Sequence, residues 1–279
     1  MYKMGLLSLF RKSDTLYFPG CMIYYKYKEN FELYQKIFSR LGISFIVLEK
    51  SVCCGIEALE AGYEQEARNI ARENYQFFKE NNIKNIITTS PECYKAFTKN
   101  YPEFIPEADI EIKNIWELLL ELLQKNNSYI RNKPMETITF HDNCYLGRYC
   151  NIYEAPRKIL EAIGYKVREM DNNKENSFCC GSCGGLPRVD AELANNLAKE
   201  RILQAKRIGV KKMVVIGFEN FHLLNKNSKN LGIEIVELSD ALAFVLGIKK
   251  REVIKEEEIE GENKILEENT EAEINIIDG

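Results

Sequence analysis

The chain contains 279 residues, 45% of them hydrophobic, and carries a formal net charge of −4. This length suits one large or two small domains, and the composition allows a substantial buried core. The charge is uneven, because residues 251–279 hold 11 acidic and 3 basic residues, but neither part is basic enough to indicate nucleic-acid binding.

Nothing in the sequence indicates export or insertion into a membrane. No apolar run approaches the roughly 20 residues that span a bilayer. The apolar patch at 6–10 is not followed by a small-residue cleavage site, which argues against a signal peptide. The nine cysteines, an odd number, favour a reducing cytoplasm over a disulfide framework.

After a leader at residues 1–14, the sequence predicts alternating strands and helices. Apolar residues recur at helical spacing between Asn30 and Leu41, and Gly42 then ends that helix. The series strand, helix, strand, helix, strand is predicted at 15–18, 30–41, 43–48, 63–79 and 83–89. Such alternation is typical of a parallel sheet with right-handed crossovers.

A helix at 115–124 is predicted to close the first half, which we place at residues 15–125. Asn114 is the predicted N-cap of this helix, with Glu117 at the capping-box position. Residues 126–135 are rich in asparagine and contain a proline, and we interpret them as a linker.

The same order of elements then begins again in a second half, residues 136–250. Strands are predicted at 137–140, 165–170, 212–216 and 233–236, and helices at 154–162, 190–208 and 240–246. We therefore predict an α/β protein with two pseudo-symmetric, Rossmann-like parallel-sheet halves related by internal duplication. The glutamate-rich segment 251–279 is expected to be disordered or to dock on a partner.

Two adjacent cysteines followed by glycine occur once in each half, at 53–55 and at 179–181. Another cysteine precedes each pair at a similar distance, Cys21 in the first half and Cys144 in the second. The repeat interval of roughly 125 residues exceeds that of solenoid proteins and indicates a duplicated domain half.

A further thiol closes the first set but not the second. Residues 90–93 read Ser-Pro-Glu-Cys, whereas the equivalent residues 217–220 read Gly-Phe-Glu-Asn. Most of the cysteines follow predicted strands, where open α/β sheets bind their ligands. Neither a GxxxxGK[ST] loop nor a G-x-G-x-x-G fingerprint is present, so nothing indicates nucleotide binding.

Adjacent cysteines in an irregular turn suit a metal cluster better than a single ion. An iron–sulfur cluster presents several irons at separated corners, each of which needs a thiolate. Gly55 and Gly181 permit the turn and a close approach of backbone to inorganic sulfur. Zinc is commonly bound by separate CxxC pairs, and Cys180 and Cys183 form the one pair present. Inert buried cysteines are the alternative, which does not explain the doubled spacing.

These motifs resemble those of the CCG-domain (cysteine-rich domain) family. That family includes the catalytic subunit of methanogen heterodisulfide reductase and the iron–sulfur subunits of glycolate and lactate oxidases. The resemblance covers residues 15–247 and also includes Pro-Gly-Cys at 19–21 and His-Asp-Asn-Cys-Tyr-Leu-Gly-Arg at 141–148. Residues 152–158 and 175–176 look most like the heterodisulfide reductase branch.

The resemblance implies a 4Fe-4S cluster in each half, of an unusual form held by five cysteines in the closest relatives. The implied cofactor and metal ligands of the first half are Cys21, Cys53, Cys54 and Cys93. Ser90 occupies the place of the fifth ligand, which puts the unusual cluster form in doubt.

In the second half the resemblance implies Cys144, Cys179 and Cys180 as ligands. Gly217 and Asn220 replace the closing pair of thiols. We predict that Cys183 supplies a fourth ligand there, with Cys150 as the other candidate. Zinc is the alternative metal at this second site.

Relatives usually have a histidine directly after the first cysteine of the second half, where this chain has Tyr145. If that histidine donates protons in relatives, Tyr145 and His141 are the candidate donors here. A structural role is the simpler interpretation for His141. His222 lies on a predicted helix, where a surface or capping role is expected and a substitute metal ligand is the alternative.

The resemblance implies an iron–sulfur oxidoreductase subunit, heterodisulfide reductase-like, that transfers electrons through cysteine-ligated clusters to a disulfide or a partner. The sequence begins too late for the ferredoxin-like domain of some relatives, so we expect a separate ferredoxin-like or flavoprotein donor. The alternative is a non-catalytic electron-transfer or scaffold subunit of a flavoprotein dehydrogenase complex, with one cluster or zinc. The missing thiols of the second half favour that alternative.

Overall fold

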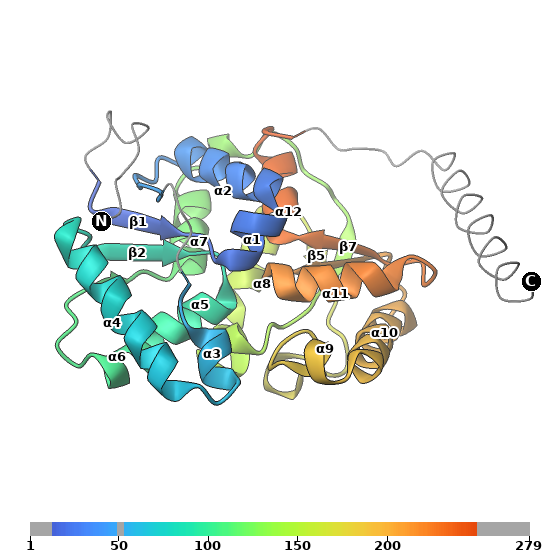
Figure 1. The fold of residues 1–279 in the computed structure, drawn as a ribbon. Helices are drawn as coiled ribbons and strands as arrows, with labels where there is room; N and C mark the ends of the chain where they lie inside the picture. Colours follow the sequence, from blue (N-terminus) through green and yellow to red (C-terminus); the bar gives the residue numbers. More distant parts are fainter. Residues whose placement is uncertain (1–12, 49–52, 250–279) are drawn as a thin grey trace, which may run out of the picture. The chain divides into compact units, whose positions relative to one another are not determined.

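The computed structural model describes residues 13–48 and 53–249. Most of the predicted leader and the predicted acidic segment 251–279 therefore lie outside the described residues. Within them, the chain from residue 13 to Ile248 belongs to one compact unit, shown as the coloured ribbon of Figure 1.

The sheet of the first half is parallel. Its strands are β1 (Thr15–Phe18), β2 (Asn85–Thr88) and β3 (Glu111–Ile112), in that order. The strand predicted at 43–48 is wrong in extent, because only Ile46 pairs there, in a parallel bridge beside β1. Ile46 exchanges backbone hydrogen bonds of 2.8 and 2.9 Å with Tyr17 and Thr15, and its neighbours follow the sheet edge without pairing.

The sheet of the second half is also parallel. Its strands are β4 (Thr137–Phe140), β5 (Lys166–Val167), β6 (Lys212–Val215) and β7 (Glu234–Glu237), in the order β5-β4-β6-β7. The two sheets share one strand order, with the Ile46 bridge in the place of β5. This shared order confirms the predicted pair of duplicated parallel-sheet halves.

Helices connect the strands in both halves. The first half contains α1 (Cys21–Lys26), α2 (Lys28–Arg40), α3 (Ile56–Glu60), α4 (Glu64–Glu80), α5 (Pro91–Lys95), α6 (Tyr101–Phe104) and α7 (Ile115–Lys125). The second contains α8 (Glu154–Ala162), α9 (Leu186–Val189), α10 (Ala191–Arg207), α11 (Phe218–Ser228) and α12 (Leu238–Val245). Figure 1 shows α2 and α4 on opposite sides of β1 and β2.

Side chains cap the starts of α7 and α10. The side chain of Asn114 accepts hydrogen bonds of 3.2 Å from the backbone N–H groups of Trp116 and Glu117, as predicted for the start of α7. Asp190 caps α10 in the same way, through the N–H of Leu193 at 2.9 Å. These caps satisfy backbone donors that have no partner within the helix.

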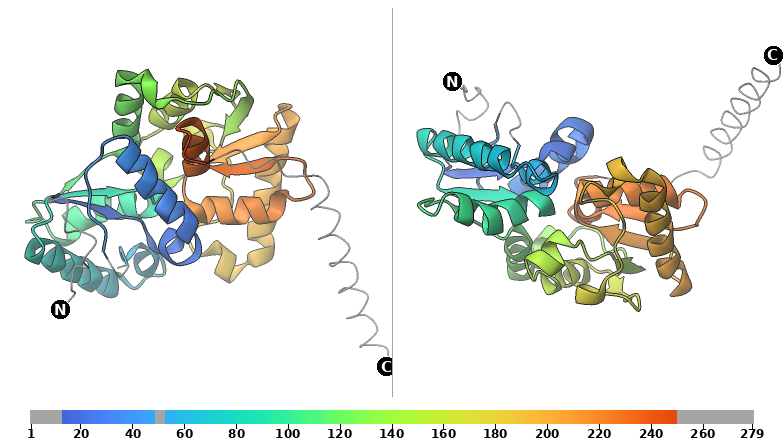
Figure 2. Two further views of the ribbon diagram at one scale, coloured as in Figure 1. Left: turned by 90° about the horizontal axis from the view of Figure 1, so that it is seen from above. Right: turned by 60° about the horizontal axis from the view of Figure 1, so that its bottom comes forward.

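The last helix of each half packs on the other half. α7 contacts α8 of the second half, and α12 contacts α2 of the first. A common hydrophobic core contains buried side chains from both halves, among them Ile37, Trp116, Ile159 and Leu242. The additional views in Figure 2 show elements of the two halves side by side. The halves therefore share this core, beside a further apolar cluster in each half, and the predicted boundary at 126–135 stays a prediction.

A buried carboxyl group stands at this junction. Glu237, which is 0% exposed, caps α12 through the backbone N–H of Ser239 at 2.7 Å. Across the junction, the hydroxyl of Tyr34 on α2 donates to both carboxylate oxygens at 3.0 and 3.2 Å. Burial raises the pKa of Glu237 to about 7.

Glu237 should make the protein less stable as the pH rises. The folded protein keeps the proton up to a pH of about 7, whereas an unfolded glutamate loses it near 4.3, so stability declines across that window. The expected loss attributable to Glu237 is about 4 kcal/mol. Denaturant unfolding of the apoprotein from pH 4 to 8 should show a smaller decline in Glu237→Gln, which keeps an acceptor for Ser239. Parallel curves for the two proteins would contradict the assignment.

Candidate metal centre

Both Cys-Cys-Gly turns have the same backbone geometry. Gly55 has φ 84° and Gly181 has φ 79°, in the region that other residues enter only with strain. The N–H of each glycine donates to the sulfur of the first cysteine of its pair, at 3.3 Å to Cys53 and 3.4 Å to Cys179. A β-carbon at Gly181 would also lie 2.8 Å from the carbonyl oxygen of Ala194. Each turn thus presents two neighbouring thiols from one loop.

The first set of thiols converges from three segments. Cys21 begins α1 just after β1, and Cys93 lies in α5 just after β2. Cys93 is hydrogen-bonded to Cys54, and this bond together with burial raises the pKa of Cys93 well above its ordinary value. A β-carbon on Gly20 would lie 3.5 Å from the sulfur of Cys93, so the two chain segments touch.

The other thiols of the first set, Cys21 and Cys53, lie close enough to Cys54 for their charges to interact. Burial raises the pKa of Cys21 to about 12, with further contributions from Glu219, Cys54 and Cys53. Burial also raises the pKa of Cys53. Without a bound cation these thiols stay protonated at neutral pH, and metal binding would release their protons.

Ser90, at the implied position of the fifth ligand, forms hydrogen bonds within its own segment of the chain. Its hydroxyl oxygen accepts a hydrogen bond from the N–H of Cys93 at 3.2 Å, and its hydroxyl donates to Glu92 at 3.0 Å. The side chain therefore caps α5.

The second set of thiols lines a pocket. Its walls are His141, Asp142, Cys144, Arg148, Phe178, Cys179, Cys180, Ser182 and Cys183. Cys183 is hydrogen-bonded to Cys144, which lowers the pKa of Cys144 and raises that of Cys183. Cys150 lies apart from the pocket walls, with its sulfur 3.8 Å from the hydroxyl of Thr98. Of the two candidates for a fourth ligand, Cys183 is the one beside the other thiols.

Asn220, the counterpart of Cys93 in the repeat, lies against this set. It is 1% exposed, and its oxygen accepts from Ser182 at 2.7 Å and lies 3.6 Å from the sulfur of Cys183. Its amide nitrogen has no partner among the described residues. A buried N–H group without a hydrogen-bond acceptor lowers the stability of the fold. A sulfur atom of a bound cluster would provide the acceptor.

The donor chemistry of both sets fits an iron–sulfur cluster. Among residues 13–48 and 53–249, no three His, Cys, Asp or Glu side chains surround the position of a single metal ion. Iron–sulfur clusters are held in proteins by cysteine thiolates, and each set supplies several cysteines. When bound, such a group accepts and donates electrons one at a time.

A pair of glutamates connects the two sets. Glu92, beside Cys93, is 6% exposed and accepts a hydrogen bond from Cys183 of the second set at 3.6 Å. Glu92 also shares a hydrogen bond with Glu219 of α11, and burial raises the pKa of both carboxyls. No sequence pattern marks this pair as part of the site, apart from the equivalent places of Glu92 and Glu219 in the repeat. The two thiol sets are thus neighbours at the junction of the halves.

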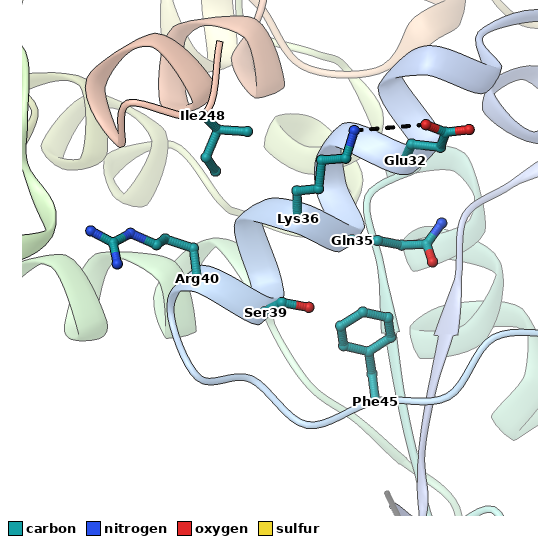
Figure 3. Close-up of a pocket in the computed structure, with 7 residues that line it drawn as sticks. All are labelled: Glu32, Gln35, Lys36, Ser39, Arg40, Phe45 and Ile248. Atoms are coloured by element: carbon teal, nitrogen blue, oxygen red, sulfur yellow. Dashed lines mark ion pairs between the residues drawn. The ribbon is translucent and has the colours of Figure 1, made fainter. Parts of the chain in front are cut away.

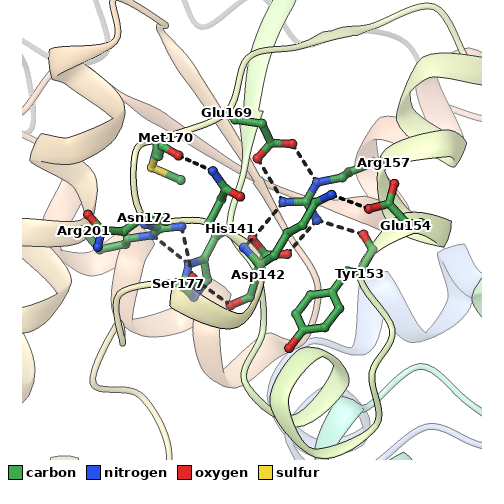
Figure 4. A network of polar contacts seen from close by, with 12 residues as sticks. His141, Asp142, Tyr153, Glu154, Arg157, Glu169, Met170, Asn172, Ser177 and Arg201 are labelled. Atoms are coloured by element: carbon green, nitrogen blue, oxygen red, sulfur yellow. Dashed lines mark hydrogen bonds and ion pairs between the residues drawn. The ribbon is translucent and has the colours of Figure 1, made fainter.

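Behind the second pocket lies a buried polar network, drawn in Figure 4. Arg157 donates to both oxygens of Asp142, at 2.7 and 2.9 Å. It also donates to both oxygens of Glu169, at 2.7 and 2.9 Å. Asp142 in turn accepts from the backbone N–H of Lys174 at 2.8 Å. Bidentate contacts of this kind fix the chain segments that carry the pocket walls.

A second buried arginine, Arg201, positions the ring of His141. The Nε–H of Arg201 donates to Nδ1 of His141 at 3.0 Å, so the ring proton resides on Nε2. Burial, with the charges of Arg201 and Arg148, lowers the pKa of His141 well below its ordinary value. His141 is therefore neutral and lines the pocket.

The other residues singled out in the sequence lie outside both thiol sets. The hydroxyl of Tyr145 donates to the carboxylate of Glu60 at 2.7 and 2.8 Å, and burial raises its pKa, with the charge of Cys183 adding. His222 lies on α11, with its ring nitrogens 2.8 Å from Tyr27 and 3.1 Å from Lys26.

A second hollow, shown in Figure 3, lies along α2. Its walls are Glu32, Gln35, Lys36, Ser39, Arg40, Phe45 and Ile248. It contains none of the predicted site residues.

Two parallel-sheet halves, each with thiols beyond the carboxyl ends of its strands, define a duplicated cysteine-rich α/β protein. The chain belongs to the cysteine-rich domain (CCG) family, whose model matches residues 15–98 and 138–217. This match confirms the resemblance inferred from the motifs.

Similar proteins include iron–sulfur oxidoreductases. A probable iron-sulfur-binding oxidoreductase, FadF, of Bacillus subtilis is 36% identical over 62% of this chain and 24% of its own length. One component of the dihydromethanophenazine:CoB–CoM heterodisulfide reductase of Methanosarcina mazei is 30% identical over 70% of this chain and 49% of its own length. The chain thus spans half or less of these relatives.

The fold itself has a solved counterpart. A hypothetical protein from Helicobacter pylori matches 85% of this chain and 49% of its own length, with a TM-score of 0.64 and 15% identity. Over the described part of the chain, no helix is both long and apolar enough to cross a membrane.

Proposed function

We propose that the chain is an iron–sulfur oxidoreductase subunit that passes electrons to a disulfide. The observation that carries this proposal is the adjacency of two thiol sets at the junction of the halves, joined through Glu92 and Cys183 at 3.6 Å. The proposed ligands are Cys21, Cys53, Cys54 and Cys93 in the first half, and Cys144, Cys179, Cys180 and Cys183 in the second.

The proposed reaction needs two electrons and two protons. A disulfide takes up both, its sulfur–sulfur bond breaks, and two thiols form. A ferredoxin-like or flavoprotein partner supplies the electrons, and the heterodisulfide reductase relative supports this class of substrate. The candidate proton donors are His141, which lines the second pocket with its proton on Nε2, and Tyr145, whose hydroxyl donates to Glu60. The nine free thiols favour a reducing compartment such as the cytoplasm.

A non-catalytic electron-transfer or scaffold subunit is the second candidate. The observation that favours it is the loss of thiols at Gly217 and Asn220, which leaves the second set open to a smaller complement of metal or to zinc.

One experiment separates the two candidates. Protein purified or reconstituted without oxygen is analysed for iron, zinc and acid-labile sulfide, and its EPR spectrum is recorded with and without an added disulfide. The oxidoreductase assignment predicts iron and sulfide in both halves and a spectrum that changes with the disulfide. Zinc alone, or a cluster whose spectrum no disulfide or thiol changes, would instead support the second candidate.

A further inference from the structure

The charges around the two thiol sets differ. The carboxylates that act on Cys21 are Glu219, the strongest charge there, and Glu57, which also acts on Cys53. Glu219 is bonded to Glu92, which contacts the second set. Because this pair touches both sets, its charge does not distinguish them.

Arginines stand at the second set. Arg148 lines the pocket, donates to the carbonyl oxygen of Ser177 at 2.8 Å and acts on Cys144. Its side chain is exposed, so solvent weakens its effect.

Arg201 is the second cation, and it is 0% exposed. It donates to His141, to the carbonyl oxygen of Asn172 at 2.7 Å and to the hydroxyl of Ser177 at 3.2 Å. It forms no ion pair with a carboxylate within 4.0 Å in the described ranges. Its charge interacts with Asp142 first and then with Cys180. A buried cation with no adjacent carboxylate is costly unless another anion compensates it.

Asp142 and Glu169 together face two arginines, Arg157 and Arg201, so they offset the charge of Arg201 in part. Both oxygens of Asp142 are bound by Arg157. Glu169 is bound by the same arginine, and its side chain is 37% exposed. Solvent weakens the effect of the partly exposed Glu169, so part of the charge of Arg201 acts on the second pocket, with neutral His141 between them.

We propose that Arg201, assisted by Arg148, gives a cluster in the second site a higher reduction potential than a cluster in the first. This inference rests on the proposed function, because it requires a redox-active cluster in each half. An added electron makes a cluster more negative, and a buried cation stabilises that state strongly where the dielectric constant is low. The remaining N–H of His141, on the pocket wall, adds a donor for sulfur, which also raises the potential.

The test is a potentiometric titration of the anaerobically reconstituted full chain, followed by EPR. Cys54→Ser and Cys183→Ser variants assign each midpoint to its site. The second site should be reduced at the higher potential. Arg201→Met should lower that midpoint by at least about 59 mV. For one electron, this equals a tenfold change in the ratio of reduced to oxidised cluster at a fixed potential. The first midpoint should stay unchanged, and Arg201→Lys, which keeps the charge, should restore most of the shift.

Arg148→Met provides a test that does not disturb the core. It should lower the same midpoint by less, and the shift should disappear at high ionic strength, unlike that of Arg201→Met. Equal midpoints in the wild type, or an unaltered second midpoint in both methionine variants with iron retained, would overturn the inference. Absence of iron and sulfide from both halves would overturn the proposed function as well.

Discussion

Replacement of Cys54 by serine is expected to remove the iron of the first half and to leave that of the second half in place. Cys54 is buried, hydrogen-bonded to Cys93 and electrostatically coupled to Cys21. Serine cannot replace it, because a hydroxyl holds its proton far more tightly than a thiol and binds iron weakly. Iron and sulfide should fall to about half, the share expected if each half holds one cluster.

Cys150→Ser is the matched control. The sulfur of Cys150 lies beside Thr98 and outside the second pocket, so iron, sulfide and the EPR spectrum should all stay as in the wild type. Disulfide reduction should be lost in Cys54→Ser and kept in Cys150→Ser. Full iron with an unchanged spectrum in Cys54→Ser would show that the first thiol set does not hold the metal.

Replacement of Arg157 by methionine should lower the free energy of unfolding by about 3–5 kcal/mol, because it leaves buried carboxylate charge without a partner. The ion pair of Arg157 with Asp142 has a distance of 2.7 Å and both side chains are almost fully buried. The loss should also loosen the backbone at Lys174, which Asp142 holds. Denaturant unfolding, with the midpoint and slope fitted separately, measures the effect.

Arg188→Met supplies the comparison for an exposed pair. Arg188 and Glu57 lie 2.8 Å apart, with side chains 77% and 54% exposed. Such pairs contribute about 0–1 kcal/mol. Equal losses in Arg157→Met and Arg188→Met would contradict the role assigned to the buried network.

The elements with strong local signals could be predicted from the sequence. β1, β4 and α8 have the predicted bounds, because short apolar strands and an amphipathic helix are defined by their own residues. β3 was missed and the strand at 43–48 was overextended. Both lie at sheet edges, where pairing with a neighbour rather than local pattern decides the length of a strand.

The cysteines of the site could be found because the repeat marks them, whereas the charged residues around them could not. Arg201 lies on α10, a helix with many charged residues, so the local sequence predicts a surface position for it. It shares the buried face of α10 with Ala194, Ala198 and Ala205, and that spacing is the one signal the sequence offered. Its contact with His141 depends on how α10 packs against the second half, which no local pattern encodes.

The last helix of each half packs on the other half, which has a consequence for the evolution of this chain. α7 lies on α8, and α12 lies on α2, so either half produced alone would expose to water apolar side chains that are buried in the shared core. The duplication has thereby become irreversible in practice. A truncated gene for a single half would encode an aggregation-prone fragment rather than a smaller working copy of the ancestor.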